Sequence, residues 1–211
     1  MDQTNKAEKH YELSRKGGSV LLRLVSADGT NRLSSAAIIE LHQTVTELSA
    51  EAERGKIRAL IITGNEKFFS AGADLNEIVR LSGPRVYEFS KAGQNLTMTL
   101  DRFPVPVIAA IEGYCMGGGM DLALACDYRI AAPNAVFGHR GASLGLITGW
   151  GGTQRLPRLI GKARALQMFL LAEMVEAEEA KRIGLVDEIA EDAVAKAFGL
   201  LNGRPSAARE T

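Results

Sequence analysis

Short apolar runs alternate along the chain with longer amphipathic stretches, and this alternation restricts the possible fold more than any other feature. Ala59–Thr63 and Val107–Ile111 are short and apolar, as strands buried on both faces of a parallel sheet are. Residues 34–53 and 83–103 space their apolar side chains at helical intervals. Because parallel strands need a crossover connection, usually a helix, the alternation predicts an α/β fold with parallel pairing.

The remaining elements follow the same alternation until about Arg155, where the pattern becomes mainly helical. Residues 68–75 are expected to form a loop that opens a short helix at Asp74, and residues 142–152 a long glycine-rich connection. Further elements are strands at residues 19–25, 128–131 and 186–189, and helices near residues 153–160, 163–172, 177–183 and 191–201. The chain divides into a polar N-terminal extension (1–17), an α/β core (18–154) and a helical C-terminal part with a polar tail (155–211).

Composition and charge exclude several classes of protein. The chain has 211 residues, 46% of them hydrophobic, and 25 basic against 25 acidic residues, so its net charge is zero. This balance argues against a basic nucleic-acid-binding surface, and the apolar content argues against a disordered chain. No run approaches the roughly 18 apolar residues of a membrane span. The polar start predicts no secretory leader, and Cys115 and Cys126 are expected to be reduced thiols of a cytoplasmic protein.

Glycine accounts for 22 of the 211 residues and gathers at Gly64 and Gly72, at Gly117–Gly119 and along residues 138–152. The first two of these places belong to loops of the same design. In each loop a predicted strand runs into small residues, at 69–74 or at 113–119, and then into a helix. A helix N-terminus leaves N–H groups unpaired and carries partial positive charge, so two such loops converging on one carbonyl would form an oxyanion hole. Either loop alone is better explained by tight packing of a helix on a strand.

Three strings of residues favour the oxyanion hole over simple packing because they occur together and in order. They are FFSAGADL at residues 68–75, AAIEGYCMGGGMDLALACDYRIAA at residues 109–132 and GGTQRLPRLIGKARA at residues 151–165. With the stretch Thr30-Asn31-Arg32-Leu33 after the first strand, they resemble the crotonase (enoyl-CoA hydratase/isomerase) superfamily. The resemblance covers about residues 18–189.

The resemblance implies a crotonase-type spiral of ββα units, followed by C-terminal helices that mediate trimers. The helical part of this chain is then a trimerisation part that is shorter than is typical of the family. Members bind acyl-CoA thioesters and stabilise an enolate at the thioester oxygen, with no metal and no tightly bound cofactor, since CoA is part of the substrate. The expected partners are an acyl-CoA and further copies of the chain, as a homotrimer or dimer of trimers (a hexamer), with no nucleic acid and no membrane.

The family's functional positions can be carried over residue by residue. The oxyanion donors are the backbone N–H groups of Ala73 and Gly118. The adenine and pantetheine of CoA are expected beside residues 70–75 and residues 27–33. The residues expected to bind substrate are Ser70, Ala71, Gly72, Asp74, Leu75, Gly117, His139, Arg140 and Gly141.

Hydratases of this family position and split a water with two glutamates, and this chain matches only one of them. Asp121 stands at the first position, one methylene shorter, and is expected to handle the proton. The alternative is that Asp121 only complements the helix dipole. The second position is Gly141, and the position that some family isomerases and dehalogenases use is Gly149. A single carboxylate still suffices to move a proton between the carbons of an enolate.

Four other side chains each have two interpretations. His139 is a replacement base or a loop histidine bonded to the backbone, and Arg140 holds a substrate carboxylate or lies at a surface or subunit interface. Trp150 lines the acyl pocket or covers the C-terminal helices. Cys115, 24 residues before His139, is similarly placed to the nucleophile of the Clp-type proteases that share the fold, or is a small buried side chain.

The leading hypothesis is therefore an enzyme of the enoyl-CoA hydratase/isomerase type, a lyase or isomerase of fatty acid metabolism. It would use Ala73, Gly118 and Asp121 as its catalytic residues. The alternatives are a catalytically weak acyl-CoA-binding homologue, an acyl-CoA decarboxylase and a Cys115-dependent thioester hydrolase. The missing second acid motivates the binding homologue, and no motif in the sequence reports the acyl chain.

Overall fold

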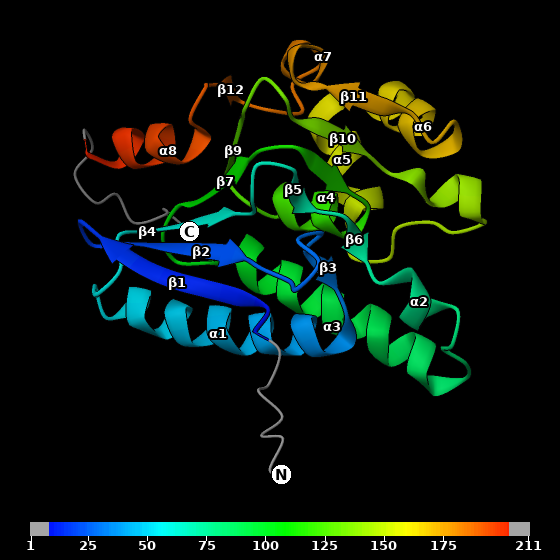
Figure 1. The fold of residues 1–211 in the computed structure, drawn as a ribbon, viewed down its shortest axis with the longest axis horizontal. Helices are drawn as coiled ribbons and strands as arrows, with labels where there is room; N and C mark the ends of the chain where they lie inside the picture. The colour runs from blue at the N-terminus through cyan, green and yellow to red at the C-terminus, as the bar shows by residue number, and fades with distance from the viewer. Residues whose placement is uncertain (1–8, 203–211) are drawn as a thin grey trace.

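The computed structural model describes residues 9–202 and confirms an α/β fold built around a six-stranded sheet (Figure 1). The strand order is β1-β2-β4-β7-β9-β12. Every neighbouring pair from β2 to β12 is parallel, and only β1 runs antiparallel to its neighbour. The strands are β1 (Tyr11–Lys16), β2 (Ser19–Leu24), β4 (Ala59–Thr63), β7 (Val107–Ile111), β9 (Tyr128–Ala131) and β12 (Glu188–Ile189).

Helices cover both faces of this sheet, which is why its central strands are apolar throughout. In β4, Leu60 and Ile62 belong to the main core with the α1 side chains, whereas Ile61 packs with Ala193 and Ala197 of α8. No helix within residues 9–202 is long and apolar enough to cross a membrane. The helices are α1 (Ser35–Glu53), α2 (Leu75–Ile78), α3 (Pro84–Asp101), α4 (Gly118–Leu124), α5 (Gly152–Ile160), α6 (Lys162–Leu170), α7 (Ala177–Arg182) and α8 (Ala193–Asn202).

The first helix shows how local sequence and packing agree. Ser34 caps α1, because its side-chain oxygen accepts a hydrogen bond from the backbone N–H of Ala37. The apolar face then packs against α3, which lies beside α1 in Figure 1. Burial of each Leu or Ile side chain on this face stabilises the folded state by roughly 1.5–3 kcal/mol. The large apolar side chains of that face are Ile38, Leu41, Val45 and Leu48.

Two smaller sheets join segments that are far apart in the sequence. One has the order β11-β10-β8-β5, and the other consists of β3 and β6 in parallel. The pairing of β5 with β8 and of β3 with β6 brings the two glycine loops into one region. Their strands are β3 (Arg32–Leu33), β5 (Phe68–Ser70), β6 (Gly72–Ala73), β8 (Tyr114–Met116), β10 (Val136–Gly138) and β11 (Met174–Glu176).

Several segments, including the following three, differ from the elements predicted from the sequence. Tyr11–Lys16 is an edge strand, although its mostly exposed side chains show no apolar face, because its shape comes from backbone pairing with β2. The predicted loop at 68–75 contains β5 and β6, whose partners are remote in the sequence. The predicted connection at 142–152 begins inside a 3-10 helix, η1 (Arg140–Leu144). Residues 1–8 of the predicted extension and 203–211 of the predicted tail lie outside the described residues.

Candidate functional site

The two glycine loops meet at Gly72 and Gly118. Gly72 has a φ of +91°, and a Cβ on it would lie 2.5 Å from the carbonyl oxygen of Met116 and 3.0 Å from the backbone nitrogen of Gly118. Any other residue at position 72 would therefore push the loops apart. Glycine is required here so that Ala73, the next residue, lies in the same region as the start of α4.

Gly118 is the first residue of α4, and Gly117 is its N-cap. The N–H of Gly117 donates to the carbonyl of Gly138 at 2.9 Å, which ties this loop to β10. The first N–H groups of a helix have no partner within the helix and carry its positive end. The N–H of Gly117 is thus already bonded within the protein, and Gly118 is the next backbone donor along this loop.

A buried pair of side chains fixes the other loop. Ser70 is fully buried, and its hydroxyl donates to the carbonyl of Asn31 at 2.7 Å and accepts from the N–H of Gly72 at 3.1 Å. Asn31 in turn donates through Nδ2 to the carbonyl of Phe68 at 2.9 Å. Its φ of +52° is one that asparagine tolerates better than most residues. The sequence did not predict that Asn31 holds this loop in place. The resemblance of residues 30–33 to the family was the one feature that pointed to it.

The other residues predicted to lie beside CoA are spread along the same loop. The N–H of Ala71 donates to the carbonyl of Thr30 at 2.9 Å, which places residues 27–33 next to residues 70–75 as expected. Asp74 caps α2 by accepting from the N–H of Asn76 at 2.8 Å, and Leu75 is 46% exposed. Polar groups of Ser70, Ala71 and Asp74 thus shape the loop, and Leu75 offers an apolar surface beside it.

Asp121 lies one turn into α4 with its side chain 1% exposed, enclosed by the segment that leads into α5. Burial raises the pKa of this carboxyl to about 6 because a charged carboxylate is poorly solvated there. The hydroxyl of Thr148 donates to Oδ2, and the backbone N–H groups of Trp150 and Gly152 also favour the charged form. The carboxyl is therefore poised between its two protonation states near neutral pH.

His139 is buried beside this carboxyl, with Nε2 3.4 Å from Oδ1 of Asp121. Burial lowers the pKa of the imidazole to about 4, so the ring is neutral at physiological pH. Within residues 9–202 neither Nε2 nor Oδ1 has a hydrogen-bond partner. Gly152 packs against both atoms, and a Cβ at that position would overlap the carboxylate. Neither sequence interpretation of His139 included this direct approach to Asp121.

Arg140 and Gly141 directly follow His139 and lie in η1. Arg140 is exposed in η1. The carbonyl of Gly141 accepts from the N–H of Leu146 at 2.8 Å, and a Cβ on Gly141 would lie 2.7 Å from the carbonyl oxygen of Leu146. This tight turn leaves little room for a glutamate without a shift of the loop. The structure therefore brings His139 to Asp121 and leaves Arg140 at the surface.

Cys115 is fully buried in β8, and burial raises the pKa of its thiol well above the ordinary value. A thiolate is the nucleophilic form, so this environment disfavours covalent catalysis by Cys115. Cys126 is also buried, and its thiol donates to the carbonyl of Leu122 at 3.4 Å. Among the described residues, no group of three or more His, Cys, Asp and Glu side chains is placed to hold a metal ion.

The opposite pKa shifts of Asp121 and His139 predict a specific pH dependence of stability. Between pH 4 and 6 both side chains are neutral in the folded protein. In the unfolded chain Asp121 is largely ionised and His139 is largely protonated over the same range. The raised pKa of Asp121 makes the free energy of unfolding fall as pH rises, and the lowered pKa of His139 makes it rise, so the two effects nearly cancel.

Removing either partner should expose the effect of the other. With His139→Gln, the free energy of unfolding should fall by about 3 kcal/mol relative to wild type as pH rises through this window. With Asp121→Asn it should rise by a similar amount. Urea unfolding at several pH values across the window measures both slopes, and slopes of the same sign in the two variants would contradict the assignment.

Comparisons with known proteins point to one family. The family model for enoyl-CoA hydratase/isomerase matches residues 15–199. Crotonyl-CoA hydratase of Syntrophomonas wolfei is 42% identical over 160 residues, which are 75% of this chain and 60% of that protein. Short-chain-enoyl-CoA hydratase of Clostridium acetobutylicum is 37% identical over 180 residues, 85% of this chain and 68% of that protein.

Solved structures show the same relationship. Pseudomonas aeruginosa DspI superposes with a TM-score of 0.86 and 36% identity, over 95% of this chain and 82% of that one. Enoyl-CoA hydratase of Bacillus anthracis gives a TM-score of 0.86 and 36% identity, over 92% of this chain and 76% of that one. This chain spans 60% of the length of the Syntrophomonas relative. By its family model, relatives and fold, it belongs to the enoyl-CoA hydratase/isomerase family of the crotonase superfamily.

Proposed function

We propose that this chain catalyses proton transfer on an acyl-CoA thioester by enoyl-CoA hydratase/isomerase chemistry. The observation that carries the proposal is the close approach of Gly72 to the backbone nitrogen of Gly118, beside the buried carboxyl of Asp121. The N–H groups of Ala73 and Gly118 would hold the thioester oxygen, and Asp121 would move the proton.

The electrostatics of the site suit an enolate. When a proton leaves a carbon next to a thioester, negative charge develops on the thioester oxygen. Two fixed N–H donors stabilise that charge in the transition state more than in the ground state, and such a donor typically contributes about 3–4 kcal/mol. The positive end of α4 adds to the stabilisation at Gly118.

Asp121 can serve as both base and acid because its pKa lies near neutral pH. As a carboxylate it takes a proton from one carbon of the acyl group, and the electron pair of that C–H bond moves onto the thioester oxygen. As a carboxylic acid it returns the proton to another carbon, and the double bond shifts. Neither step needs a second carboxylate.

The glycine at position 141 favours this one-acid chemistry over water addition. Hydratases of the family use a second carboxylate at that position, and here the turn to Leu146 encloses a glycine instead. His139 is the other buried ionisable group beside Asp121, so hydration through these two side chains is the second candidate activity. A chain that binds acyl-CoA with little turnover is the third.

The names of the relatives indicate the class of substrate to test first. The Syntrophomonas protein is named a crotonyl-CoA hydratase, and a relative from Escherichia coli, 40% identical over 177 residues, is named a 2,3-dehydroadipyl-CoA hydratase. Both names describe 2-enoyl-CoA thioesters. We therefore extend the proposal to 2-enoyl-CoA substrates of this kind.

Mass spectrometry of crotonyl-CoA incubated with the purified protein in heavy water tests the proposal. Deuterium incorporation without added water is the expected result, because it reports an enolate formed and reprotonated. A gain of one water would favour hydration by Asp121 and His139. Release of free CoA would favour hydrolysis, and unchanged crotonyl-CoA and 2,3-dehydroadipyl-CoA would overturn the enzymatic proposal in favour of the binding protein.

Assembly and location are parts of the same proposal. Exposed apolar side chains gather on η1, the segment after it and the end of α6, which supports a homotrimer or dimer of trimers. These side chains are Leu144, Ile147, Leu166, Leu170 and Leu171. The two buried cysteine thiols support a cytoplasmic location, where thiols stay reduced.

A further inference from the structure

Trp150 is buried between α3 and α4, where two glycines make room for its ring. The side chain is 5% exposed. A Cβ on Gly93 of α3 would overlap the five-membered ring, and a Cβ on Gly118 of α4 would overlap the six-membered ring. The indole therefore lies directly against the residue that we propose as an oxyanion donor.

The backbone of Trp150 is held firmly at this position. Its carbonyl accepts from the hydroxyl of Thr97 at 2.8 Å and from Nη1 of Arg155 at 3.2 Å. Its N–H favours the charged carboxylate of Asp121. One residue thus contacts the acid through its backbone and the donor glycine through its ring. An acyl group held at Gly118 would therefore have this indole directly beside its oxyanion donor.

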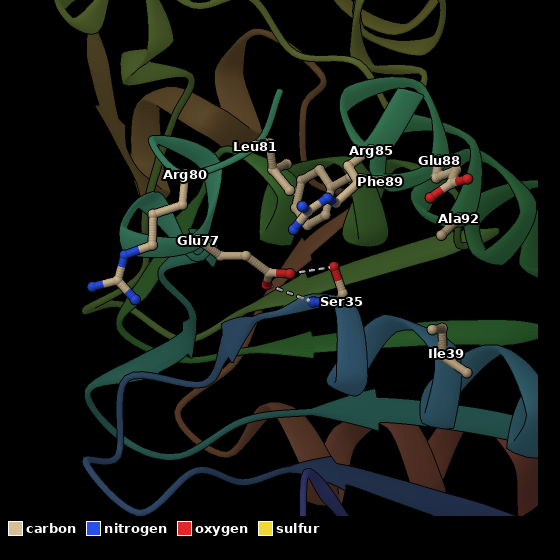
Figure 2. A pocket seen from close by; sticks show the side chains of 9 residues that line it. All are labelled: Ser35, Ile39, Glu77, Arg80, Leu81, Arg85, Glu88, Phe89 and Ala92. Atoms are coloured by element: carbon tan, nitrogen blue, oxygen red, sulfur yellow. Dashed lines mark hydrogen bonds between the residues drawn. The ribbon is translucent and has the colours of Figure 1, made fainter. Parts of the chain in front are cut away.

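The indole also contacts a second aromatic ring, and that ring lines a pocket. The ring of Phe89 is 5.4 Å from the indole, centroid to centroid, at an angle of 52°. Phe89 lines a pocket of about 390 Å³ between α1, α2 and α3 (Figure 2). Leu81, Ile39 and Ala92 supply further apolar lining, and Arg80 and Arg85 lie around it. The order from the donor is Gly118, Trp150, Phe89 and then the pocket.

We propose that Trp150 sets the acyl-chain specificity of this enzyme by closing the path from the oxyanion donor to the pocket behind Phe89. With the indole in place, only short 2-enoyl groups fit beside the ring at the donor. Without it, a longer alkyl chain passes Gly93 toward Phe89 and the pocket. This inference rests on the proposed acyl-CoA activity and adds the length of the acyl group to it.

Replacing Trp150 by alanine tests the inference through the chain-length profile. The ratio of kcat/KM for octenoyl-CoA to that for crotonyl-CoA should rise at least about tenfold, since a methylene that fits or fails to fit changes this ratio by roughly 10–200-fold. Each methylene that the new space buries favours binding by about fourfold. Trp150→Phe, which keeps an aromatic core, should shift the ratio in the same direction by less.

Two further variants separate specificity from general loosening of the core. Phe103→Ala removes an equally buried aromatic ring just beyond the C-terminal end of α3 and should leave the ratio within about twofold of wild type. Phe89→Ala alone should also leave it unchanged, because the indole still closes the path. Phe89→Ala combined with Trp150→Ala should extend activity further, to dodecenoyl-CoA. If Phe103→Ala shifts the profile as much as Trp150→Ala does, the inference is wrong.

A binding measurement distinguishes failure of this inference from failure of the proposed function. Calorimetric titration with butyryl-CoA and octanoyl-CoA reports acyl-length preference without turnover. If the wild type binds both but turns over no enoyl-CoA, the proposed chemistry fails, and the effect of Trp150→Ala on relative affinity still decides the inference. An unchanged preference in both Trp150 variants would overturn the inference even if crotonyl-CoA is a good substrate.

Discussion

Asp121→Asn should lower kcat by about 10²–10⁴-fold, the usual contribution of a positioned general acid or base. The amide has nearly the same shape as the carboxyl and can still accept from the hydroxyl of Thr148 through its oxygen. It cannot take or give a proton in the relevant pH range. Because Asp121 contributes no donor to the thioester oxygen, affinity for acyl-CoA should change little. Steady-state kinetics and calorimetric titration with butyryl-CoA measure the two effects separately.

The pH profile adds a second test of Asp121. In the wild type, activity should depend on a group with a pKa of about 6, and this dependence should be absent from the residual activity of Asp121→Asn. Asp192→Asn is a matched control, since Asp192 is exposed and caps α8 by accepting from the N–H of Ala195 at 2.7 Å. Asparagine caps helices equally well, so this control should retain activity. Full activity in Asp121→Asn would remove Asp121 from the mechanism.

Gly72→Ala should lower kcat/KM by about 10²–10³-fold, the range seen when one oxyanion donor is lost. The new Cβ would lie 2.5 Å from the carbonyl oxygen of Met116 and 3.0 Å from the nitrogen of Gly118, so the loops must separate. The N–H groups of Ala73 and Gly118 can then no longer both donate to the thioester oxygen. The variant should also lose stability, because alanine at positive φ costs roughly 1–2 kcal/mol.

Gly55→Ala controls for the backbone strain alone. Gly55 has a φ of +71° and no heavy atom within 4 Å of the position that a Cβ would take. The variant should lose a similar amount of stability and keep its activity. Thermal unfolding and kinetics on both variants separate the two effects. Equal losses of activity in Gly55→Ala and Gly72→Ala would show that strain, and not loop separation, is responsible.

The sequence predicted the large sheet and its helices well, because each of these elements has its apolar pattern within its own segment. Ala59–Thr63 and Val107–Ile111 are strands with the predicted limits, and the helix predicted over residues 34–53 is α1 with Ser34 as its cap. Their apolar patterns follow from burial on both faces or on one face. The strand Tyr11–Lys16 was missed because its pairing depends on backbone groups and not on its side chains.

The site was predicted only in part, since several of its contacts join residues that no local pattern connects. The two glycine loops were located by their small residues and following helices. The approach of His139 to Asp121 depends on the pairing of β10 with β8, which precedes α4, and the position of Trp150 depends on glycines at 93 and 118. A lone glycine within a helix, such as Gly93, gave no sign of what would pack against it.

The position of Trp150 also provides a spectroscopic signal. The sequence contains one tryptophan, so all indole emission of the protein comes from this ring. The ring is buried against Gly118 and within ring contact of Phe89. A ligand that enters beside it changes the polarity around a single chromophore. Intrinsic fluorescence therefore reports occupancy of this one place in an unlabelled protein, without a coupled assay and without turnover.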